Sequence, residues 1–300
     1  MKKETIYQTG RYEAYVRHTE SKTIVVSFAE RKEPKPASFS GESMLEKTGL
    51  SYCCIRSLEN DWYVHSEFEN CLDSVELETS KYENVILYGF SMGSYGALRS
   101  ARKLGAKKII LMAPISNIHP EFDKRWISDY RHLIEKHNEK SLNPNIDRGM
   151  SVFVVYDKKG PDVSHVKNIS HLTNVKSLMV DRSGHMVFQM LNSSGILGKV
   201  ARGLMQENAD VESLQGLINK SKKNSSLYIS ELSKSLGKHK KLKINLLNYA
   251  VSKFPDDSTI KLDLAGANAE LGNFSEAAKI IRSVVRDTGQ PMSVPVIRAL

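Results

Sequence analysis

The 300-residue sequence contains only three cysteines, and their positions exclude several classes of protein. Cys53 and Cys54 are adjacent in an apolar run and Cys71 falls in a predicted helix, so they do not make a disulfide framework. No C-x-x-C pair or histidine cluster with metal-ligand spacing accompanies them, and we predict no metal site. We therefore expect a cytoplasmic chain with reduced thiols.

Long apolar runs are also missing from the sequence. No stretch approaches the roughly 18 apolar residues that a membrane-spanning helix needs, so we predict no membrane span. Residues 1–18 carry lysines but no apolar segment, so we predict no secretory signal. The overall composition, 40% hydrophobic and 26% charged, is that of an ordinary globular protein.

Acidic residues are fewer than basic ones, and the formal net charge is +9. The basic runs lie at 219–226 and 238–243, without interleaved aromatic residues, zinc-ligand spacing or a recognition-helix pattern. Because charge alone does not specify nucleic-acid binding, we do not predict that function. A solvated helix face and attraction to an anionic substrate both remain open as explanations.

The first two thirds of the chain alternate strand-like and helix-like segments. The runs at 11–18 and 23–28 predict an antiparallel hairpin at one edge of the sheet. Further strands are predicted at 50–57, 84–90, 106–114, 151–157 and 175–181, and helices at 66–80, 92–104, 163–171 and 186–205. Short β-branched strands between helices indicate an α/β fold, with a mostly parallel sheet covered on both faces.

Two regions break this alternation. Residues 115–150 form a long, polar, aromatic-bearing connection, which we interpret as a cap inserted at the carboxyl edge of the sheet. Strand patterns stop after about residue 205, so we divide the chain into an α/β domain at 1–205 and a small all-α domain at 206–300.

The C-terminal domain shows a repeated pattern. Leu236-Gly237 and Leu271-Gly272 are 35 residues apart, each between two helix-like segments. The stretch "LAGANAELGNFSEAAKII" resembles a tetratricopeptide repeat, which implies paired antiparallel helices over 225–290. Its small residues, expected at helix interfaces, are Ala265, Ala269 and Ala277. Two hairpins bury little surface, so we expect this domain to dock on the catalytic body, a second subunit or a partner protein.

The stretch "VILYGFSMGSYGAL", residues 85–98, carries the strongest chemical signal. A buried strand runs into Gly89-Phe90-Ser91-Met92-Gly93, and a helix-compatible segment follows. A serine on a tight strand-to-helix turn has an exposed hydroxyl, and small neighbours relieve the crowding. The pattern predicts that Ser91 is a nucleophile.

An acid and a histidine follow Ser91 in the order that serine nucleophiles of this kind require. Asp157 and Asp162 come after one predicted strand, and His185 follows the last one, behind Gly184. All lie where carboxyl ends of parallel strands meet, the edge at which open α/β sheets bind ligands. We prefer Asp162 as the acid and interpret Asp157 as a turn or capping residue.

With these motifs, the chain resembles the α/β-hydrolase superfamily over residues 10–205. "YGFSMGSYGAL", "KIILMAPISNI" and "DRSGHMVF" also resemble bacterial esterases and O-acetyltransferases associated with capsule or cell-surface polysaccharide loci. The resemblance implies that Ser91 attacks an acyl carbonyl, that His185 is its base, and that Asp162 orients the imidazole. It also implies an oxyanion hole made by the backbone amides of Met92 and Ala29, although "FAE" replaces the usual His-Gly pair at the second position.

These features predict a serine-dependent acyl-ester hydrolase that needs no cofactor. The alternative is an O-acyltransferase that moves an acetyl group from acetyl-CoA to a polysaccharide hydroxyl, and a non-catalytic scaffold is a third reading. The expected partners are an acyl-ester or glycan substrate, anionic if the basic surface attracts it, and a protein bound through the helical domain.

Two further expectations concern residues outside these motifs. His165, three residues after Asp162 on a predicted helix, is interpreted as a surface or capping histidine. Trp62 and Tyr63 follow a strand end, and both a substrate-lining role and core packing remain open for them.

Overall fold

The computed structural model describes residues 3–31, 39, 41–137, 146–147 and 149–288. The chain divides into two compact units, one within 1–188 and 197–218, the other within 189–196 and 219–300. The remaining parts of the predicted 115–150 cap and of the helical domain lie outside the described residues.

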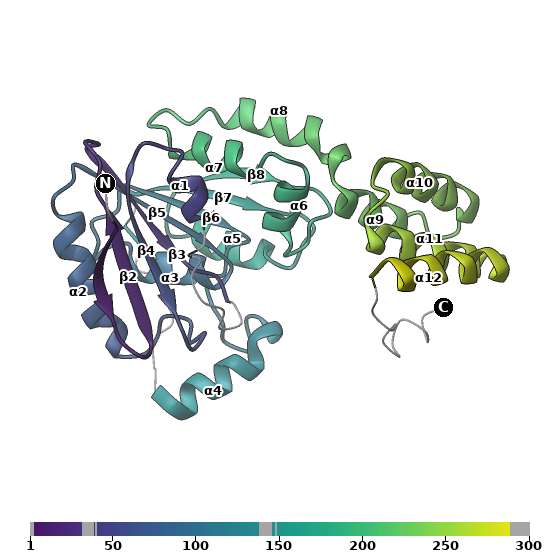
Figure 1. Cartoon of the computed structure of the whole chain (residues 1–300). Coiled ribbons are helices and arrows are strands. Elements are labelled where there is room, and N and C mark those ends of the chain that lie inside the picture. The colour runs from purple at the N-terminus through teal and green to yellow at the C-terminus, as the bar shows by residue number, and fades with distance from the viewer. Residues whose placement is uncertain (1–2, 32–38, 40, 138–145, 148, 289–300) are drawn as a thin grey trace. The chain divides into compact units, whose positions relative to one another are not determined.

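An eight-stranded sheet crosses the described part of the first unit in the order β1-β2-β4-β3-β5-β6-β7-β8 (Figure 1). In this described sheet only β2 runs against the others, because it pairs antiparallel with both β1 and β4 while all remaining pairs are parallel. The mostly parallel sheet predicted from the sequence is thus confirmed. The strands are β1 (Glu4–Gln8), β2 (Tyr12–Arg17), β3 (Thr23–Phe28), β4 (Ser51–Ser57), β5 (Asn84–Phe90), β6 (Lys108–Met112), β7 (Ser151–Tyr156) and β8 (Val175–Met179).

The predicted hairpin between 11–18 and 23–28 is wrong, although the antiparallel edge is present. Strand β4 lies between β2 and β3, and β3 pairs in parallel with both β4 and β5. The reason is burial, since β3 is covered on both faces along almost its whole length. A strand of that kind belongs in the interior of a parallel sheet rather than in an edge hairpin. The sequence prediction also missed β1.

Helices connect the strands and cover the sheet. Helix α2 packs on β1 and β2, and α3 packs on β3, β5 and β6. The helix predicted over 186–205 is divided in two at Gly195, which adopts a left-handed conformation with φ of 73°. The helices up to residue 221 are α1 (Glu42–Leu45), α2 (Glu67–Thr79), α3 (Met92–Ser100), η1 (Lys124–Trp126), α4 (Ile127–His137), α5 (Val163–Ser170), α6 (Val187–Ser193), α7 (Leu197–Met205) and α8 (Val211–Ser221).

Helix α8 is attached to the sheet rather than to the helical unit. The Gln215 side chain donates to the Met179 carbonyl at 3.0 Å and accepts from the Met179 amide at 2.7 Å, which supplies partners to the exposed edge of β8. Most of α8 belongs to the compact unit that extends to Ile218.

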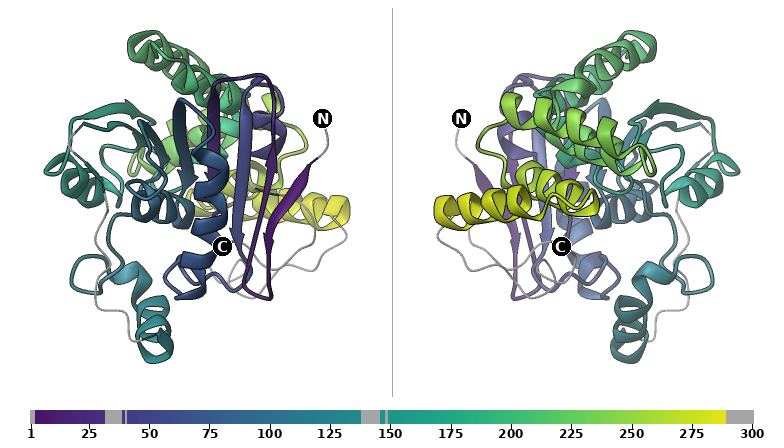
Figure 2. Two further views of the ribbon diagram at one scale, coloured as in Figure 1. Left: turned by 90° about the vertical axis from the view of Figure 1, so that its left-hand side faces the viewer. Right: turned by 90° about the vertical axis from the view of Figure 1, so that its right-hand side faces the viewer.

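The segment between β6 and β7 contains η1 and α4, and both views in Figure 2 show α4 standing off from the body of the sheet. Its near end is nevertheless anchored. Asp129 accepts from the indole of Trp62 at 3.2 Å and from the guanidinium of Arg31 at 2.6 Å.

The second unit is all-helical. Successive helices pack on one another, and α11 and α12 lie side by side (Figures 1 and 2). Gly237 and Gly272 have φ values of 44° and 89°, so both equivalent turns use a left-handed glycine. Ala265 and Ala277 are buried as predicted, whereas Ala269 is only half-buried. Besides most of α6, its elements are η2 (Lys222–Asn224), α9 (Ser226–Lys234), α10 (Lys240–Lys253), α11 (Ser258–Glu270) and α12 (Phe274–Thr288).

The three cysteines are buried free thiols. Burial raises the pKa of Cys54 and of Cys71 to about 12, so neither is a thiolate at neutral pH. None of the helices in the described part of the chain is long and apolar enough to cross a membrane.

Two glycines allow α3 to approach the sheet closely. A Cβ on Gly93 would lie 2.1 Å from the Phe28 carbonyl oxygen of β3, and one on Gly89 would lie 2.3 Å from the Gly93 carbonyl oxygen. Both neighbours are backbone atoms that cannot move independently. The turn from β5 to α3 therefore requires glycine on each side of Ser91.

We expect Gly93→Ala to lower the free energy of unfolding of the first unit by about 3 kcal/mol or more, the upper range for overpacking. The matched control is Gly216→Ala in α8, where a Cβ meets no atom within 4 Å. That variant should gain up to about 1 kcal/mol, because alanine favours helix over glycine. Urea unfolding followed by tryptophan fluorescence reports on this unit, since Trp62 and Trp126 both lie in it. Equal midpoints for the two variants would show that the close approach does not constrain the fold.

Candidate active site

Ser91 occupies the sharp turn between β5 and α3 with φ of 51° and ψ of −118°, a region that non-glycine residues rarely adopt. Its amide still donates to the Met112 carbonyl at 3.0 Å, which continues the ladder between β5 and β6. The Ser94 hydroxyl donates to the Ser91 carbonyl at 2.6 Å and accepts from the Ile115 amide at 2.8 Å. The strained backbone is thus held from both sides.

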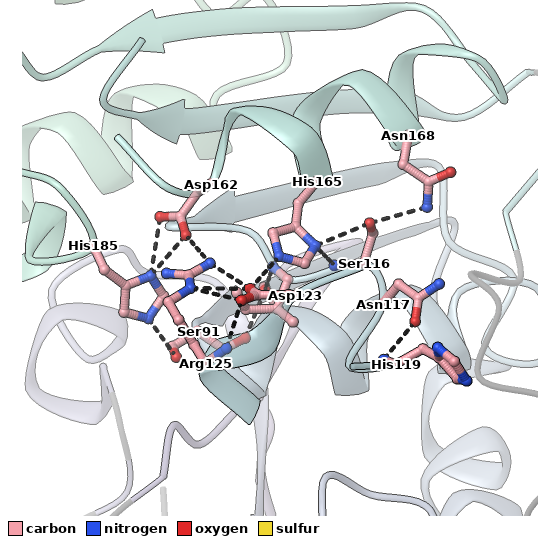
Figure 3. A network of polar contacts seen from close by, with 12 residues as sticks. Ser91, Ser116, Asn117, His119, Asp123, Arg125, Asp162, His165, Asn168 and His185 are labelled. Atoms are coloured by element: carbon pink, nitrogen blue, oxygen red, sulfur yellow. Dashed lines mark hydrogen bonds and ion pairs between the residues drawn. The ribbon is translucent and has the colours of Figure 1, made fainter. Parts of the chain in front are cut away.

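His185 connects Ser91 to Asp162, and the structure brings these three predicted residues into contact (Figure 3). His185 Nε2 lies 2.9 Å from Ser91 Oγ, and Nδ1 lies 3.0 Å from both carboxylate oxygens of Asp162. Because a carboxylate only accepts hydrogen bonds, Nδ1 carries the proton and Nε2 accepts from the serine hydroxyl. This is the arrangement that general-base activation of a serine requires.

Asp162 stands at the N-terminus of α5 without capping it. A side chain at this position commonly accepts from the first backbone amides of the helix, but Asp162 makes no such bond. Its carboxylate turns to His185 and Arg125 instead, and the residue is 0% exposed.

Asp157 organises the loops that carry the other residues. Its carboxylate accepts from the Lys159 amide at 2.9 Å and from the Gly184 amide at 3.0 Å, and its carbonyl accepts from Gly160. These bonds tie the turn before Asp162 to the loop before His185. The geometry supports Asp162 over Asp157 as the partner of His185, and the catalytic roles themselves stay a prediction.

The two predicted oxyanion donors differ in their surroundings. The Met92 amide is at the first position of α3, and no acceptor for it occurs among the described residues. The Ala29 amide instead donates to the Ile55 carbonyl at 2.9 Å, which extends the pairing of β3 with β4. In this conformation Ala29 does not offer an oxyanion donor. A second donor from this connection would have to come from an amide after Ala29.

A buried ionic cluster adjoins Asp162, and no sequence motif indicates it. Arg125 donates through Nε and Nη2 to the carboxylate of Asp123 at 2.6–3.0 Å, and through Nη2 to Asp162 Oδ1 at 2.9 Å. His165 Nε2 donates to Asp123 Oδ2 at 2.9 Å, and its Nδ1 accepts from the Ser116 amide at 3.0 Å. Helix α5 and the insertion are therefore joined by charged groups directly beside the candidate triad (Figure 3).

The pKa shifts in this cluster follow from its geometry. Burial alone would raise the pKa of Asp123, but the hydrogen bonds from His165 and Arg125 outweigh burial and lower it. Burial would lower the pKa of Arg125, but the bond to Asp123 and the attraction of Asp162 raise it. Asp123 and Arg125 are accordingly both charged at neutral pH.

Aromatic rings enclose the imidazole of His185. The Phe90 ring is roughly parallel to it with centroids 5.9 Å apart, and the Trp126 ring meets it edge-on at 5.8 Å. Trp126 in turn packs against Trp62 at 4.9 Å. The Nε1–H of Trp126 is buried, with no acceptor among the described residues.

Three residues outside the triad are buried in the structure. His165 is 0% exposed, so its interpretation as a surface or capping histidine is wrong. Its position three residues after Asp162 puts both side chains on one face of α5, a signal already present in the sequence. Trp62 and Tyr63 are fully buried, which settles their open alternative in favour of core packing.

No group of three or more His, Cys, Asp and Glu side chains among the described residues is arranged to hold a metal ion. The acidic and histidine side chains of the site are instead engaged with Arg125, Ser91 and one another.

Amide substitutions separate the two aspartates. Asp162→Asn should lower the turnover number on an activated ester by about 10⁴-fold, because an amide in that place can stabilise the wrong imidazole tautomer. Asp157→Asn should change turnover much less, since that carboxylate only accepts from backbone amides of the loops. Steady-state kinetics with p-nitrophenyl acetate measure both. A crippling Asp157→Asn beside a mild Asp162→Asn would reverse the assignment.

No known family model matches the sequence, and no curated protein matches it. Among solved structures the chain is similar to the capsule O-acetyltransferase of Neisseria meningitidis serogroup A, at 12% identity and a TM-score of 0.47 over 72% of this chain and 93% of that chain. It is similar to Est1E from Butyrivibrio proteoclasticus, at 11% identity and a TM-score of 0.43 over 73% of this chain and 98% of that chain.

A further likeness is to the Glycosylation Associate Protein (Gap123) complex from Streptococcus agalactiae, at 16% identity and a TM-score of 0.47. It covers 69% of this chain and 47% of that chain, so this chain spans about half its length. At these identities the likenesses assign no activity. Two features of this chain itself identify its fold. Among the described strands only β2 is antiparallel in the sheet order, and Ser91 lies on the elbow after β5. The chain has the α/β-hydrolase fold.

Proposed function

We propose that the chain is a serine-dependent acyl-ester hydrolase that works through an acyl-enzyme intermediate on Ser91. The observation that carries the proposal is the 2.9 Å contact between Ser91 Oγ and His185 Nε2, made at a residue held at positive φ. A hydroxyl placed in this way has a general base within reach of its proton, and the strained turn keeps it clear of its own backbone.

The proposed reaction has two halves. In the first, Ser91 Oγ attacks the ester carbonyl carbon while its proton passes to His185 Nε2, and Asp162 stabilises the imidazolium. The Met92 amide donates to the developing oxyanion. The bond to the alcohol oxygen then breaks, and that oxygen takes the proton from His185. In the second half a water molecule replaces the alcohol, loses its proton to His185, and releases the carboxylic acid with Ser91 restored.

An O-acyltransferase is the second candidate, with acetyl-CoA as donor and a polysaccharide hydroxyl as acceptor. The same residues would form the acyl-enzyme, and a sugar hydroxyl would replace water in the second half. Incubation with acetyl-CoA and an anionic polysaccharide separates the candidates, because only a transferase yields O-acetylated polymer and free CoA.

A non-catalytic scaffold is the third candidate. The contact of Ser91, His185 and Asp162 argues against it, since a decayed site loses such geometry.

The helical unit is proposed to place the catalytic unit on its substrate or partner. Residues 219–300 contain fourteen Lys and Arg but seven Asp and Glu, so most of the net charge of +9 lies there. This charge suits an anionic acceptor polymer. Binding of the protein to an anionic polysaccharide should therefore weaken as salt concentration rises, and salt-independent binding would contradict the idea.

Removal of the nucleophile or the base tests the proposed function. Ser91→Ala should abolish hydrolysis of p-nitrophenyl acetate, and His185→Ala should lower the turnover number by roughly 10³-fold or more. Both variants should remain folded, because neither side chain fills the core beneath the sheet. Steady-state kinetics with circular dichroism as the folding control measure this.

The matched control for His185→Ala is His119→Ala, a histidine of the insertion whose polar contacts are local. It should leave turnover within about twofold of the parent, as surface substitutions commonly do. Full activity in Ser91→Ala would refute the proposed function.

A further inference from the structure

The carboxylate of Asp162 has two side-chain partners, and both lie within hydrogen-bond distance of the same oxygen atom. Oδ1 lies 3.0 Å from His185 Nδ1 and 2.9 Å from Arg125 Nη2, and the aspartate is 0% exposed. Because no solvent reaches it, these two side chains must compensate the charge and fix its orientation. His185 is neutral in the resting state of the proposed mechanism, so the compensation comes from Arg125.

Arg125 is itself fixed on its other side. Its guanidinium makes three hydrogen bonds to Asp123, and the Asp123 carboxylate also accepts from His165 Nε2. His165 Nδ1 accepts from a backbone amide, so its proton is on Nε2 and the ring is neutral. Arg125 is therefore the cation that two buried carboxylates share, among the residues that the structure describes.

The net charge of this cluster becomes neutral during the proposed reaction. At rest Asp123, Asp162 and Arg125 sum to −1, and the two imidazoles are neutral. When His185 takes the proton of Ser91, the sum becomes zero. Without Arg125 the resting cluster would hold two carboxylates and no cation, and Asp162 would lose the hydrogen bond that fixes one of its oxygens. Rotation of its carboxylate would then remove the acceptor that orients His185 Nδ1.

We propose that Arg125 is a positioning residue of the active site: it holds Asp162 turned toward His185, and so makes the insertion part of the catalytic machinery. The proposal rests on the proposed function for its catalytic consequence, but the hydrogen bond between Asp162 and His185 can be observed without any substrate. Arg125 acts through Asp162, because its Nε and Nη2 groups donate to the two carboxylates.

The alternative is that Arg125 only fastens the insertion to α5. The two roles make different predictions. If Arg125 only fastens the insertion, its removal lowers activity by destabilising the insertion. If Arg125 positions Asp162, its removal takes away the cation beside Asp162, and a small cation from solution can replace it. The Arg125 side chain is 29% exposed, so its removal leaves a site that guanidinium from solution can reach.

The test compares Arg125→Ala and Arg125→Lys with Arg131→Ala, which removes an exposed arginine of the same insertion. Two quantities are measured for each: the turnover number and KM on p-nitrophenyl acetate, and the downfield proton NMR signal of His185 Nδ1–H, assigned by its loss in His185→Ala. Thermal unfolding of every variant is the folding control.

We expect Arg125→Ala to lower the turnover number by about 10- to 100-fold with little change in KM, the usual loss when a residue that orients a functional group is removed. The Nδ1–H signal should broaden or disappear. Guanidinium chloride at concentrations below unfolding should restore both, Arg125→Lys should fall between Arg125→Ala and the parent, and Arg131→Ala should match the parent.

The outcomes separate this proposal from the proposed function. Loss of the Nδ1–H signal in Arg125→Ala, restored by guanidinium, supports the positioning role even if the parent hydrolyses no ester, in which case only the proposed function fails. An unchanged signal in a folded Arg125→Ala overturns the proposal whatever the activity. A lower melting temperature with lost activity, rescued by neither lysine nor guanidinium, also overturns it and leaves Arg125 a fastening residue.

Discussion

The close approach of α3 to β3 at Gly93 is the constraint on which the candidate site depends. With glycine there, the helix can begin directly against the Phe28 carbonyl, and the chain has to turn sharply at Ser91 to reach it. The turn gives Ser91 its positive φ, and the start of the helix leaves the Met92 amide without an intrahelical partner. A nucleophile position and an oxyanion donor thus arise from one packing contact.

The second constraint is the burial of charge. Placing Asp162 at 0% exposure gives His185 a strong acceptor, but it also removes water from a carboxylate. The fold offsets this with Arg125, delivered by the segment after β6, and with the N-terminus of α5. The insertion therefore does more than cover the sheet edge, because its short helix η1 supplies charge to the site. The aromatic rings of Phe90 and Trp126 complete the enclosure of the imidazole.

Local signals in the sequence predicted the elements that local forces determine. The run from Val85 to Leu98 was enough to place Ser91 on an elbow, and chain order pointed to Asp162 and His185. The position of β4 between β2 and β3 was not predictable in this way, since it depends on which distant strand pairs with the edge of β3. Asp123 and Arg125 look like ordinary solvated charges in a polar segment, and only their tertiary contacts reveal otherwise.

The central claim is that Ser91 is an activated nucleophile rather than a turn residue. Intact-protein mass spectrometry after reaction with a fluorophosphonate, followed by peptide mapping, tests this without knowledge of the natural substrate. The account predicts one adduct per chain, located on Ser91 and lost when the protein is unfolded before labelling. Labelling on another serine, or no labelling of a folded sample, would contradict it.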